Sequence, residues 1–320
     1  MATASVRVLA EANSADSPPK IRQLRQVSPL RAVPDLSQRS APFLKWVGGK
    51  TRLLAQLTQL LPDGKYRYAE PFLGGGAMFF HLHNAGKLQH AVLADFSRDI
   101  VATNLAVKNT PKPLIAALQV HQSRYIAGDE SERSEYFYAV RARHPSEQPM
   151  SDVERAARML FLNRTCFNGL WRENASGRFN APHGKYAQPN VVQEDRIWAA
   201  HRALQTAQIV HSDFRQLPEL AKEHRLNFIY LDPPYHPLSA TSSFNAYSGG
   251  QFSAQSQREL ADVCRELDRA GVRWLLSNSD CAYVRDLYQD FSLHTVMAPR
   301  SINSKGDGRG EVGEVAICNY

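Results

Sequence analysis

The sequence has few cysteines and no long apolar run. Four cysteines occur in 320 residues, and no two of them form a C-x-x-C pair. This scatter is not typical of a zinc site or of a dense disulfide framework, so we expect reduced thiols and no bound metal. The chain also lacks the ~18 consecutive apolar residues of a membrane span and the apolar core of a signal peptide. These absences favour a soluble protein with a cytoplasmic location and no membrane partner.

Charge and length are the features present in excess. Lys and Arg number 38 against 31 Asp and Glu, a net charge of +7, which favours an anionic partner. Hydrophobic residues make up 43% of the chain and charged residues 22%, so a large folded core is expected. A chain of 320 residues allows two domains or one enlarged domain.

The first 42 residues differ in composition from the rest. Residues 1–42 contain five prolines, many Ser, Ala and Arg, and no sustained periodicity, so they are predicted to be a disordered extension. Acidic residues at Glu11, Asp16 and Asp35 disfavour a transit peptide. The ordered chain is expected to begin at Phe43.

Short β-rich runs then alternate with helical periods, the pattern of a mostly parallel α/β sheet with helices on both faces. The predicted strands are residues 66–70, 91–95, 208–211, 227–231, 273–277, 294–297 and 314–318. Between the second and third strands the apolar spacing is helical over 114–125, 134–143 and 153–161. We therefore predict a catalytic domain of residues 43–110 and 208–320, interrupted by an inserted domain of residues 111–207.

A glycine-rich turn follows the first predicted strand. The strand ends at Glu70 and continues as Pro71-Phe72-Leu73-Gly74-Gly75-Gly76, an arrangement that lets backbone approach a ligand below a helix. A dinucleotide fingerprint would need glycine at Phe79, so a nucleoside without pyrophosphate fits better. Asp95 ends the second strand and is placed to accept the two hydroxyl hydrogens of a ribose; the alternative is a helix N-cap.

Upstream lies the segment Lys45-Trp46-Val47-Gly48-Gly49-Lys50-Thr51. A triphosphate loop would require glycine at Leu44, so that function is disfavoured. Lys50 instead suits the carboxylate of a zwitterionic ligand, and Trp46 suits its flat part. A core tryptophan beside a helix cap is the alternative.

The fourth predicted strand ends in Asp232-Pro233-Pro234-Tyr235. Two prolines remove backbone donors, so the Asp232 carboxylate and the Pro233 carbonyl can face one pocket as acceptors. Two such acceptors match an exocyclic amino group, and the Tyr235 ring matches an extruded base. A purely structural turn is the alternative for this motif alone.

Residues 163–186 form a basic and aromatic stretch within the insert. Four basic residues against Glu173 give a net charge of +3, interleaved with Phe167, Trp171, Phe179 and Tyr186. Basic groups among aromatics are what phosphate neutralisation and base stacking require, although a solvated basic face is the alternative. The turn Asn174-Ala175-Ser176-Gly177 predicts a β-hairpin that could enter a nucleic-acid groove.

With these motifs in this order, the chain resembles the Dam-type DNA adenine methyltransferases from about Phe43 to its C-terminus. The resemblance implies a Rossmann-like methyltransferase sheet, S-adenosylmethionine as cofactor, and a mostly helical target-recognition insert. It implies catalytic roles for Asp232, Pro233 and Tyr235. It implies cofactor contacts from Trp46, Lys50, Glu70, Phe72, Gly74, Asp95, Asp213, Phe214 and Asp232. It implies DNA contacts from Lys45, Phe167, Asn168, Leu170, Arg172, Asn174, Arg178, Asn180, Pro182 and Lys185.

The expected function is methylation of the 6-amino group of a flipped adenine in double-stranded DNA, within GATC. The expected enzyme is monomeric and associated with the nucleoid, and it acts alone or beside a restriction endonuclease. Ser277 and Asn278, which end the fifth predicted strand, are expected to shape the pocket. The 239–252 segment is expected to form a mobile loop near the flipped adenine. A basic stretch with Arg300, Lys305 and Arg309 is expected to contact phosphates.

Two alternatives remain open at this point. The same acceptors could hold an amino group of RNA or of a glutamine side chain. A non-catalytic DNA-binding regulator is the other, and it would predict loss of Asp232 or of the glycine turn, both of which are intact.

Overall fold

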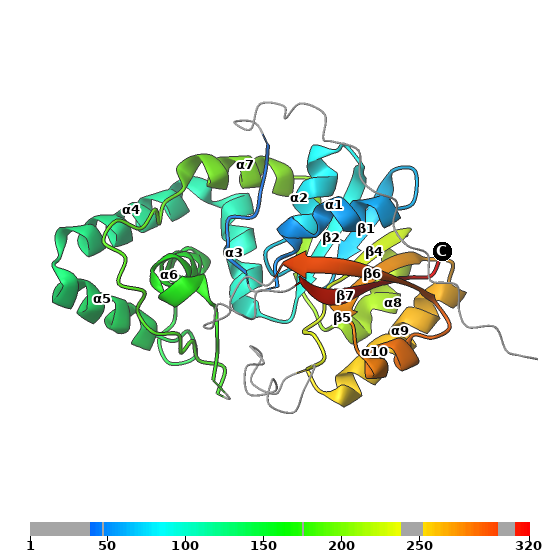
Figure 1. The fold of residues 1–320 in the computed structure, drawn as a ribbon. Coiled ribbons are helices and arrows are strands. Elements are labelled where there is room, and N and C mark those ends of the chain that lie inside the picture. Colours follow the sequence, from blue (N-terminus) through cyan, green and yellow to red (C-terminus); the bar gives the residue numbers. More distant parts are fainter. Residues whose placement is uncertain (1–38, 47, 175, 238–251, 300–310) are drawn as a thin grey trace, which may run out of the picture.

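The computed structural model describes residues 39–46, 48–174, 176–237, 252–299 and 311–320 (Figure 1). The expectations for residues 1–38, for 239–251 of the predicted mobile loop and for the basic stretch at 300–309 therefore lie outside the described residues.

All seven predicted strands are present, with ends that move by a few residues. The strands are β1 Tyr66–Glu70, β2 Leu88–Asp95, β3 Ala207–His211, β4 Phe228–Leu231, β5 Arg273–Ser279, β6 Ser292–Pro299 and β7 Glu311–Cys318. The α-helices are α1 Leu54–Leu57, α2 Ala77–Asn84, α3 Arg98–Asn109, α4 Pro111–Ala127, α5 Glu130–Ala142, α6 Asp152–Thr165, α7 Glu194–Leu204, α8 Leu217–Glu223, α9 Ala254–Arg269 and α10 Ala282–Leu287. Short 3-10 helices are η2 Lys50–Arg52, η3 Thr58–Leu60, η4 Phe167–Gly169 and η5 Phe214–Gln216.

The strands form a single sheet in the order β3-β2-β1-β4-β5-β7-β6. Strands β1 to β5 pair in parallel, and β7 pairs antiparallel with both β5 and β6. The strand order reverses between β1 and β4. Ligands of open α/β sheets bind at such a reversal, at the carboxyl ends of the strands.

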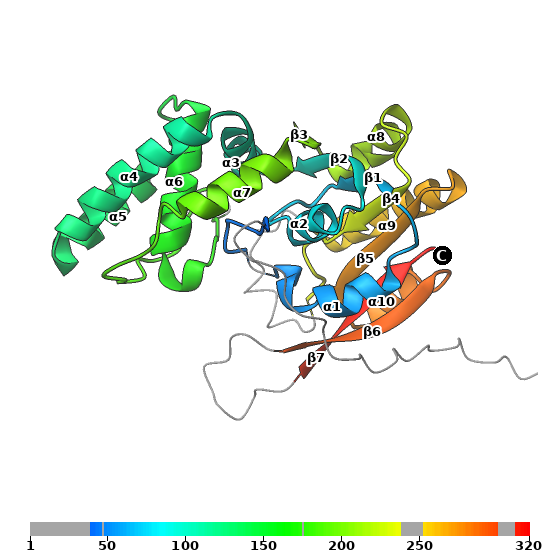
Figure 2. The same cartoon turned by 90° about the horizontal axis from the view of Figure 1, so that it is seen from above.

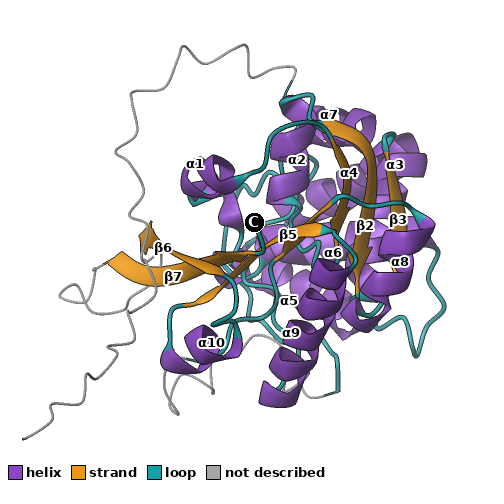
Figure 3. Cartoon of the chain, turned by 90° about the vertical axis from the view of Figure 1, so that its right-hand side faces the viewer, coloured by secondary structure: helices purple, strands orange, loops and turns teal. Residues whose placement is uncertain are grey.

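Helices cover both faces of this sheet, as the sequence predicts (Figure 3). Successive side chains of a strand point to opposite faces. In β4, Phe228 and Tyr230 accordingly join the core beneath α1, α2 and α3, whereas Ile229 and Leu231 join the core beneath α8, α9 and α10. Both faces of β4 are buried, which explains why its sequence is apolar without alternation.

The predicted helical insert is seen as α4, α5 and α6, which stand to one side of the sheet (Figure 2). Asp129 and Ser151 begin α5 and α6 through capping boxes, each with a glutamate at the third helical position. Helix α6 packs on α3 and α4, so the insert shares an apolar core with one face of the sheet. Helix α7 lies within 111–207 and packs against α4 of the insert as well as against α2, α3 and β3.

The packed chain begins before Phe43. Ser40 is 5% exposed, and its backbone N–H and hydroxyl both donate to Oδ1 of Asn84, at 3.1 and 2.9 Å. Nδ2 of Asn84 returns a bond of 2.8 Å to the Ser40 carbonyl. Residues 40–42 therefore belong to the folded part, because an asparagine at the end of α2 binds this backbone.

None of the described helices has the length and apolar character needed to cross a membrane. Within the described residues there is also no cluster of three or more His, Cys, Asp or Glu side chains that could hold a metal ion. The four cysteines are free thiols.

Candidate active site and nucleic-acid interface

Three acidic side chains lie at neighbouring strand ends. Glu70 ends β1, Asp95 ends β2, and Asp232 directly follows β4. Because β2, β1 and β4 are adjacent and parallel, their carboxyl ends meet at one edge of the sheet. The fold thus brings together at the strand-order reversal three acids that are up to 162 residues apart (232 − 70).

Lys50 and Asp232 form an ion pair at this edge. Nζ of Lys50 lies 2.7 Å from Oδ1 of Asp232, with the two side chains 4% and 20% exposed. Nζ also donates to the Gly48 carbonyl at 2.6 Å and lies 4.6 Å from the centre of the Tyr235 ring. Burial raises the pKa of Asp232, and the nearby Lys50 ammonium opposes that rise. The ammonium therefore favours the ionised form of the Asp232 carboxylate.

The turn after β4 is fixed by side chains from α9 and β5. Nε2 of Gln257 donates to the Pro234 carbonyl at 2.9 Å, and Oε1 of Gln257 accepts from Nδ2 of Asn278 at 3.1 Å. Oδ1 of Asn278 accepts from the His236 backbone N–H at 3.1 Å, and the Ser279 hydroxyl donates to the His236 carbonyl at 2.7 Å. These contacts occupy the Pro234 carbonyl and do not use that of Pro233.

Two groups at this turn escaped the sequence analysis. Gln257 is 1% exposed on a helix whose sequence shows only ordinary amphipathic spacing, so no signal marked it. Glu314 on β7 accepts a hydrogen bond of 2.5 Å from the Tyr235 hydroxyl. A polar residue beginning an otherwise apolar run was the only available signal for Glu314.

The glycine turn packs directly against Trp46. Gly74 has φ of +47°, and a Cβ added there would lie 2.7 Å from indole atoms of Trp46. The Gly74 backbone N–H donates to Oδ2 of Asp95 at 3.0 Å, so the turn and the second acid are joined. Oδ1 of Asp95 accepts from the Ser97 N–H at 2.8 Å, whereas the Ser97 hydroxyl caps α3. Asp95 is therefore not the N-cap of that helix.

Both acids beside this turn have raised pKa values. Burial raises the pKa of Asp95 to about 6, although bonds from the backbone of Gly74 and Ser97 oppose the rise. Burial raises the pKa of Glu70 to about 8, with hydrogen bonds from Tyr68 and Phe79 opposing it. Glu70 is 3% exposed and accepts from the Tyr68 hydroxyl at 2.9 Å. These environments favour a cationic ligand, which would stabilise the ionised carboxylates.

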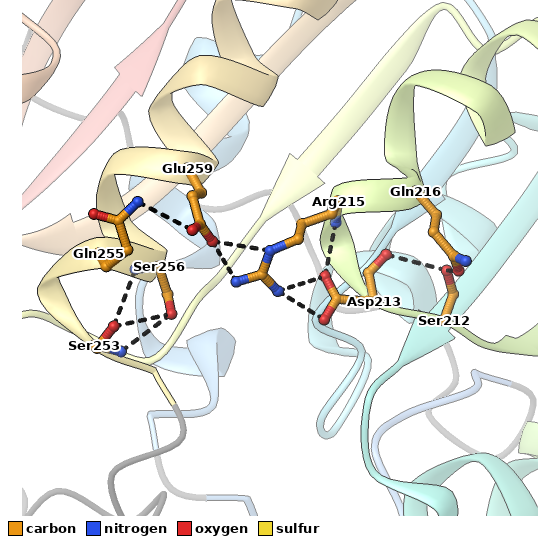
Figure 4. A network of polar contacts seen from close by, with 8 residues as sticks. All are labelled: Ser212, Asp213, Arg215, Gln216, Ser253, Gln255, Ser256 and Glu259. Carbon is orange, nitrogen blue, oxygen red and sulfur yellow. Dashed lines mark hydrogen bonds and ion pairs between the residues drawn. The ribbon is translucent and has the colours of Figure 1, made fainter.

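An aromatic cluster lies beyond the glycine turn. Phe72 stacks on Phe214 with ring centres 5.7 Å apart, and Phe252 meets Phe72 edge-on at 5.7 Å. Asp213 caps η5 and pairs with Arg215, whose guanidinium bridges to Glu259 on α9 (Figure 4). The family resemblance predicts that Asp213 and Phe214 lie beside a cofactor; in the structure the Asp213 carboxylate pairs with Arg215.

Lys45 connects the N-terminal segment, near the edge that carries the three acids, to the insert. Its backbone N–H donates to Oδ1 of Asn163 at 2.8 Å, and Nδ2 of Asn163 returns a bond of 2.8 Å to the Lys45 carbonyl. The Lys45 stem also lies against Gly169, where a Cβ would come within 2.5 Å of it. Its ammonium is 5.9 Å from the Tyr186 ring. Lys45 is exposed.

The predicted hairpin is held by an isolated antiparallel bridge between Glu173 and Phe179. Oδ1 of Asn174 accepts from the backbone N–H of Arg178, which fixes the turn. Nε of the exposed Arg172 donates to Oδ1 of Asn180 at 2.8 Å. The hairpin thus has a single bridge and no regular strand on either side of its turn.

Arg178 contacts a residue outside the hairpin, unlike Arg172. It pairs with Glu147, in the segment that follows α5. Arg141, His144 and Asn180 line the same hollow as Arg178.

The remaining predicted DNA-binding residues lie around η4. Phe167 is 53% exposed, and its backbone N–H donates to the Pro182 carbonyl at 2.9 Å. Asn168 is exposed with φ of 56°, and its N–H donates to the Tyr186 hydroxyl at 3.2 Å. Leu170 is partly buried and follows the same turn, and Lys185 pairs with Glu130 at 3.0 Å. Exposed aromatic, amide and basic groups therefore share this surface.

Comparison with known proteins assigns the family. Residues 46–302 match the model of the D12 class N6 adenine-specific DNA methyltransferases. The chain is 37% identical over 287 residues to Type II methyltransferase M.MjaIII of Methanocaldococcus jannaschii, covering 87% of this chain and 99% of that protein. It is 35% identical over 280 residues to the DNA adenine methylase of Serratia marcescens, covering 87% and 98%. It is 36% identical over 287 residues to the DNA N-6-adenine-methyltransferase of Escherichia phage P1, covering 89% and 36%.

The Dam-type resemblance, the α/β fold and the enzymatic class predicted from the sequence are thereby confirmed. This protein belongs to the D12 class of N6 adenine-specific DNA methyltransferases.

Proposed function

We propose that this enzyme methylates the 6-amino group of an adenine that it flips out of double-stranded DNA, within GATC, with S-adenosylmethionine as donor. The observation that carries the proposal is the turn at Asp232, held at the strand-order reversal by Gln257 and Asn278. These contacts leave the Pro233 carbonyl to act as a second acceptor beside the carboxylate.

Residues around the glycine turn would hold the cofactor. The Trp46 indole lies so close to Gly74 that no side chain would fit at position 74. A turn without a side chain there lets backbone come close to a flat ligand. Asp95 would accept the two ribose hydroxyls, and the acidic Glu70 would face the cationic amino acid part. Lys50 suits its carboxylate, whereas Phe72, Phe214 and Asp213 would border the adenine of the cofactor. When bound, S-adenosylmethionine supplies the electrophilic methyl group.

Catalysis would rest on orientation of the target amino group. The Asp232 carboxylate and the Pro233 carbonyl would accept its two hydrogens, which directs the nitrogen lone pair away from the ring and towards the methyl group. The Tyr235 ring would stack on the extruded base. The nitrogen becomes acidic only as it is methylated, so no separate general base is needed before attack.

Target recognition would lie in residues 111–207, proposed as the recognition domain. Arg172 is suited to bidentate contact with a guanine, a pair worth ~1–3 kcal/mol of discrimination. Phe167, Asn168, Leu170, Asn180 and Pro182 would surround it, with Lys45 at the outer guanine. Asn174 would shape the hairpin, whereas Arg178 and Lys185 would contact phosphates. Action on chromosomal DNA would place the enzyme at the nucleoid.

Transfer of labelled methyl groups tests this proposal. The protein is incubated with labelled S-adenosylmethionine and three matched duplexes: one with GATC, one with a single base pair of that site changed, and one already methylated at both adenines. Label in N6-methyladenine of the first duplex alone is expected. Equal labelling of the first two would refute GATC, and absence of label from adenine in every duplex would refute the reaction.

A further inference from the structure

Glu314 lies at the proposed active edge because β7 is antiparallel to its neighbours β5 and β6. In the sheet β7 pairs antiparallel with β5, and Glu314 lies opposite Ser279. Ser279 is at the carboxyl end of β5, where the parallel strands present Glu70 and Asp232. The start of the last strand thus supplies a carboxylate to the edge that other strands reach at their ends.

Glu314 is the outer member of a line of contacts. Its Oε2 accepts from the Tyr235 hydroxyl at 2.5 Å. The ring of Tyr235 lies 4.6 Å from Nζ of Lys50, and that ammonium is 2.7 Å from Oδ1 of Asp232. The carboxylate of Glu314 therefore fixes the far end of the ring whose face meets the ammonium.

The protonation state of Tyr235 suits this bond. Burial raises the pKa of Tyr235 well above its ordinary value, and the charges of Asp232 and Glu314 add to the rise. The hydroxyl therefore stays protonated and remains a donor to Glu314.

The backbone and the ring of Tyr235 are held by separate groups. Gln257, Asn278 and Ser279 hold the flanking backbone at Pro234 and His236. Glu314 holds the hydroxyl at the other end of the side chain. Loss of Glu314 should therefore free the ring while the turn keeps its place.

We propose that Glu314 is a positioning residue for adenine methylation, which acts by accepting the Tyr235 hydroxyl and so orienting the ring that stacks on the flipped base. The inference rests on the proposed function, because it assumes that Tyr235 meets the target adenine. Glu314 itself touches neither substrate nor cofactor in this account. The part that matters is its acceptor oxygen and not its charge.

A set of five variants tests this assignment: Glu314→Ala, Glu314→Gln, Tyr235→Phe, the double variant Glu314→Ala/Tyr235→Phe, and Tyr235→Ala. Single-turnover methylation gives the rate constant, and 2-aminopurine in place of the target adenine reports flipping by its fluorescence. Thermal unfolding of each variant measures folding separately. Tyr320→Phe is the matched control, because it removes a tyrosine hydroxyl bond to the Leu60 carbonyl at the opposite end of β7.

Glu314→Ala and Tyr235→Phe are each expected to lower the single-turnover rate about tenfold, the upper end of the net contribution of one side-chain hydrogen bond. The double variant should fall no further than either single one, since both remove the same bond. Glu314→Gln retains an acceptor oxygen and should stay within about threefold of the wild type. Tyr320→Phe should leave the rate unchanged.

Four outcomes would overturn the assignment: an unchanged rate in Tyr235→Phe, an unchanged rate in Glu314→Ala, multiplied losses in the double variant, or equal losses in Glu314→Gln and Glu314→Ala. If Glu314→Ala does not fold, Tyr235→Phe and Glu314→Gln still decide it. Tyr235→Ala separates this inference from the proposed function. Full activity of Tyr235→Ala would refute the proposed site itself, whereas an inactive Tyr235→Ala with a fully active Glu314→Ala would refute the role of Glu314 alone.

Discussion

The sheet edge and the hairpin around Glu173 and Phe179, which are the proposed catalytic and recognition sites, hold their polar side chains in opposite ways. At the edge Lys50 and Glu70 are 4% and 3% exposed, and their bonds reach other elements of the fold. In the hairpin Arg172 is exposed, and it bonds within the hairpin itself, to Asn180. The edge is organised before any ligand binds, whereas the hairpin keeps its polar groups available for a partner.

The two regions also differ in electrostatics. Burial at the edge raises the pKa of Glu70 to about 8 and of Asp95 to about 6, so ionising these groups is costly until a cation arrives. The exposed pairs Arg178–Glu147 and Lys185–Glu130 lie in water, where solvent screening leaves such pairs little effect on stability. Exchanging these partners for phosphates therefore costs little.

The largest effect is expected at the edge, for Asp232→Ala. It should reduce methyl transfer about 1000-fold, the scale of losing a preorganised electrostatic group, while leaving DNA affinity within severalfold. Rates are measured in single turnover and DNA affinity by fluorescence anisotropy. Because Lys50 would lose its partner, Asp232→Asn serves as the matched variant for stability. Methylation retained by both variants would contradict the catalytic role.

Gly74→Ala should come next, through cofactor binding. Its Cβ would meet the Trp46 indole at 2.7 Å, so either the turn or the indole must move. We expect cofactor affinity to fall about tenfold or more by isothermal titration calorimetry, on the scale of ~1.4 kcal/mol per factor of ten. Gly86→Ala is the control, since Gly86 also has positive φ but open space around it. Equal losses in the two variants would indicate backbone strain alone.

In the hairpin, Arg172→Ala and Arg178→Ala should separate base reading from phosphate contact. Loss of Arg172 should reduce discrimination between GATC and singly altered duplexes by ~1–3 kcal/mol. Loss of Arg178 should weaken binding to all duplexes alike and lower the salt dependence by about one counterion. Affinities are measured across several salt concentrations. Uniform weakening by Arg172→Ala would make it a phosphate contact.

The smallest effect concerns Glu70 and pH. A carboxyl whose folded pKa is raised from 4.5 to about 8 contributes stability that is fully present below about pH 4.5 and is lost progressively as pH rises to about 8. Glu70→Gln removes this titration, so the variant does not lose this stability at alkaline pH. The unfolding midpoint of the variant minus that of the wild type should therefore increase by a few degrees as pH rises. Unfolding is followed from about pH 5 to 9. A difference between the two proteins that is constant with pH would contradict the assigned titration.

The positions of the strands along the chain, and the helical character of the stretch between the second and third strands, were readable from local patterns. Apolar runs such as Phe228–Leu231 and the glycine turn at Gly74 depend on neighbours in the chain, so periodicity and turn chemistry locate them. The structure moved strand ends and placed Ser40 in the folded part, because Asn84 binds it from a distant helix end. Such long-range bonds leave no periodic signal.

In the candidate site, too, some residues could be predicted from local sequence and others could not. Asp232, Asp95 and Glu70 stand at strand ends, so they meet once β2, β1 and β4 pair in parallel as neighbours. Gln257 and Glu314 reach the same turn from a surface helix and an antiparallel strand. Gln257 and Glu314 are far from the turn in sequence, so no local pattern predicts contacts that arise only from strand pairing and helix packing.

The sequence by itself determined the chemistry: three acids, a glycine turn and an Asp-Pro-Pro-Tyr motif in the order of an adenine methyltransferase. Tertiary structure decided which groups fix the Asp-Pro-Pro-Tyr turn in place. They are Lys50, which pairs with Asp232, and Gln257 and Glu314, which bind Pro234 and Tyr235. The physical reason is that backbone conformation follows local residue types, whereas the partner of a buried polar group depends on which distant element packs beside it.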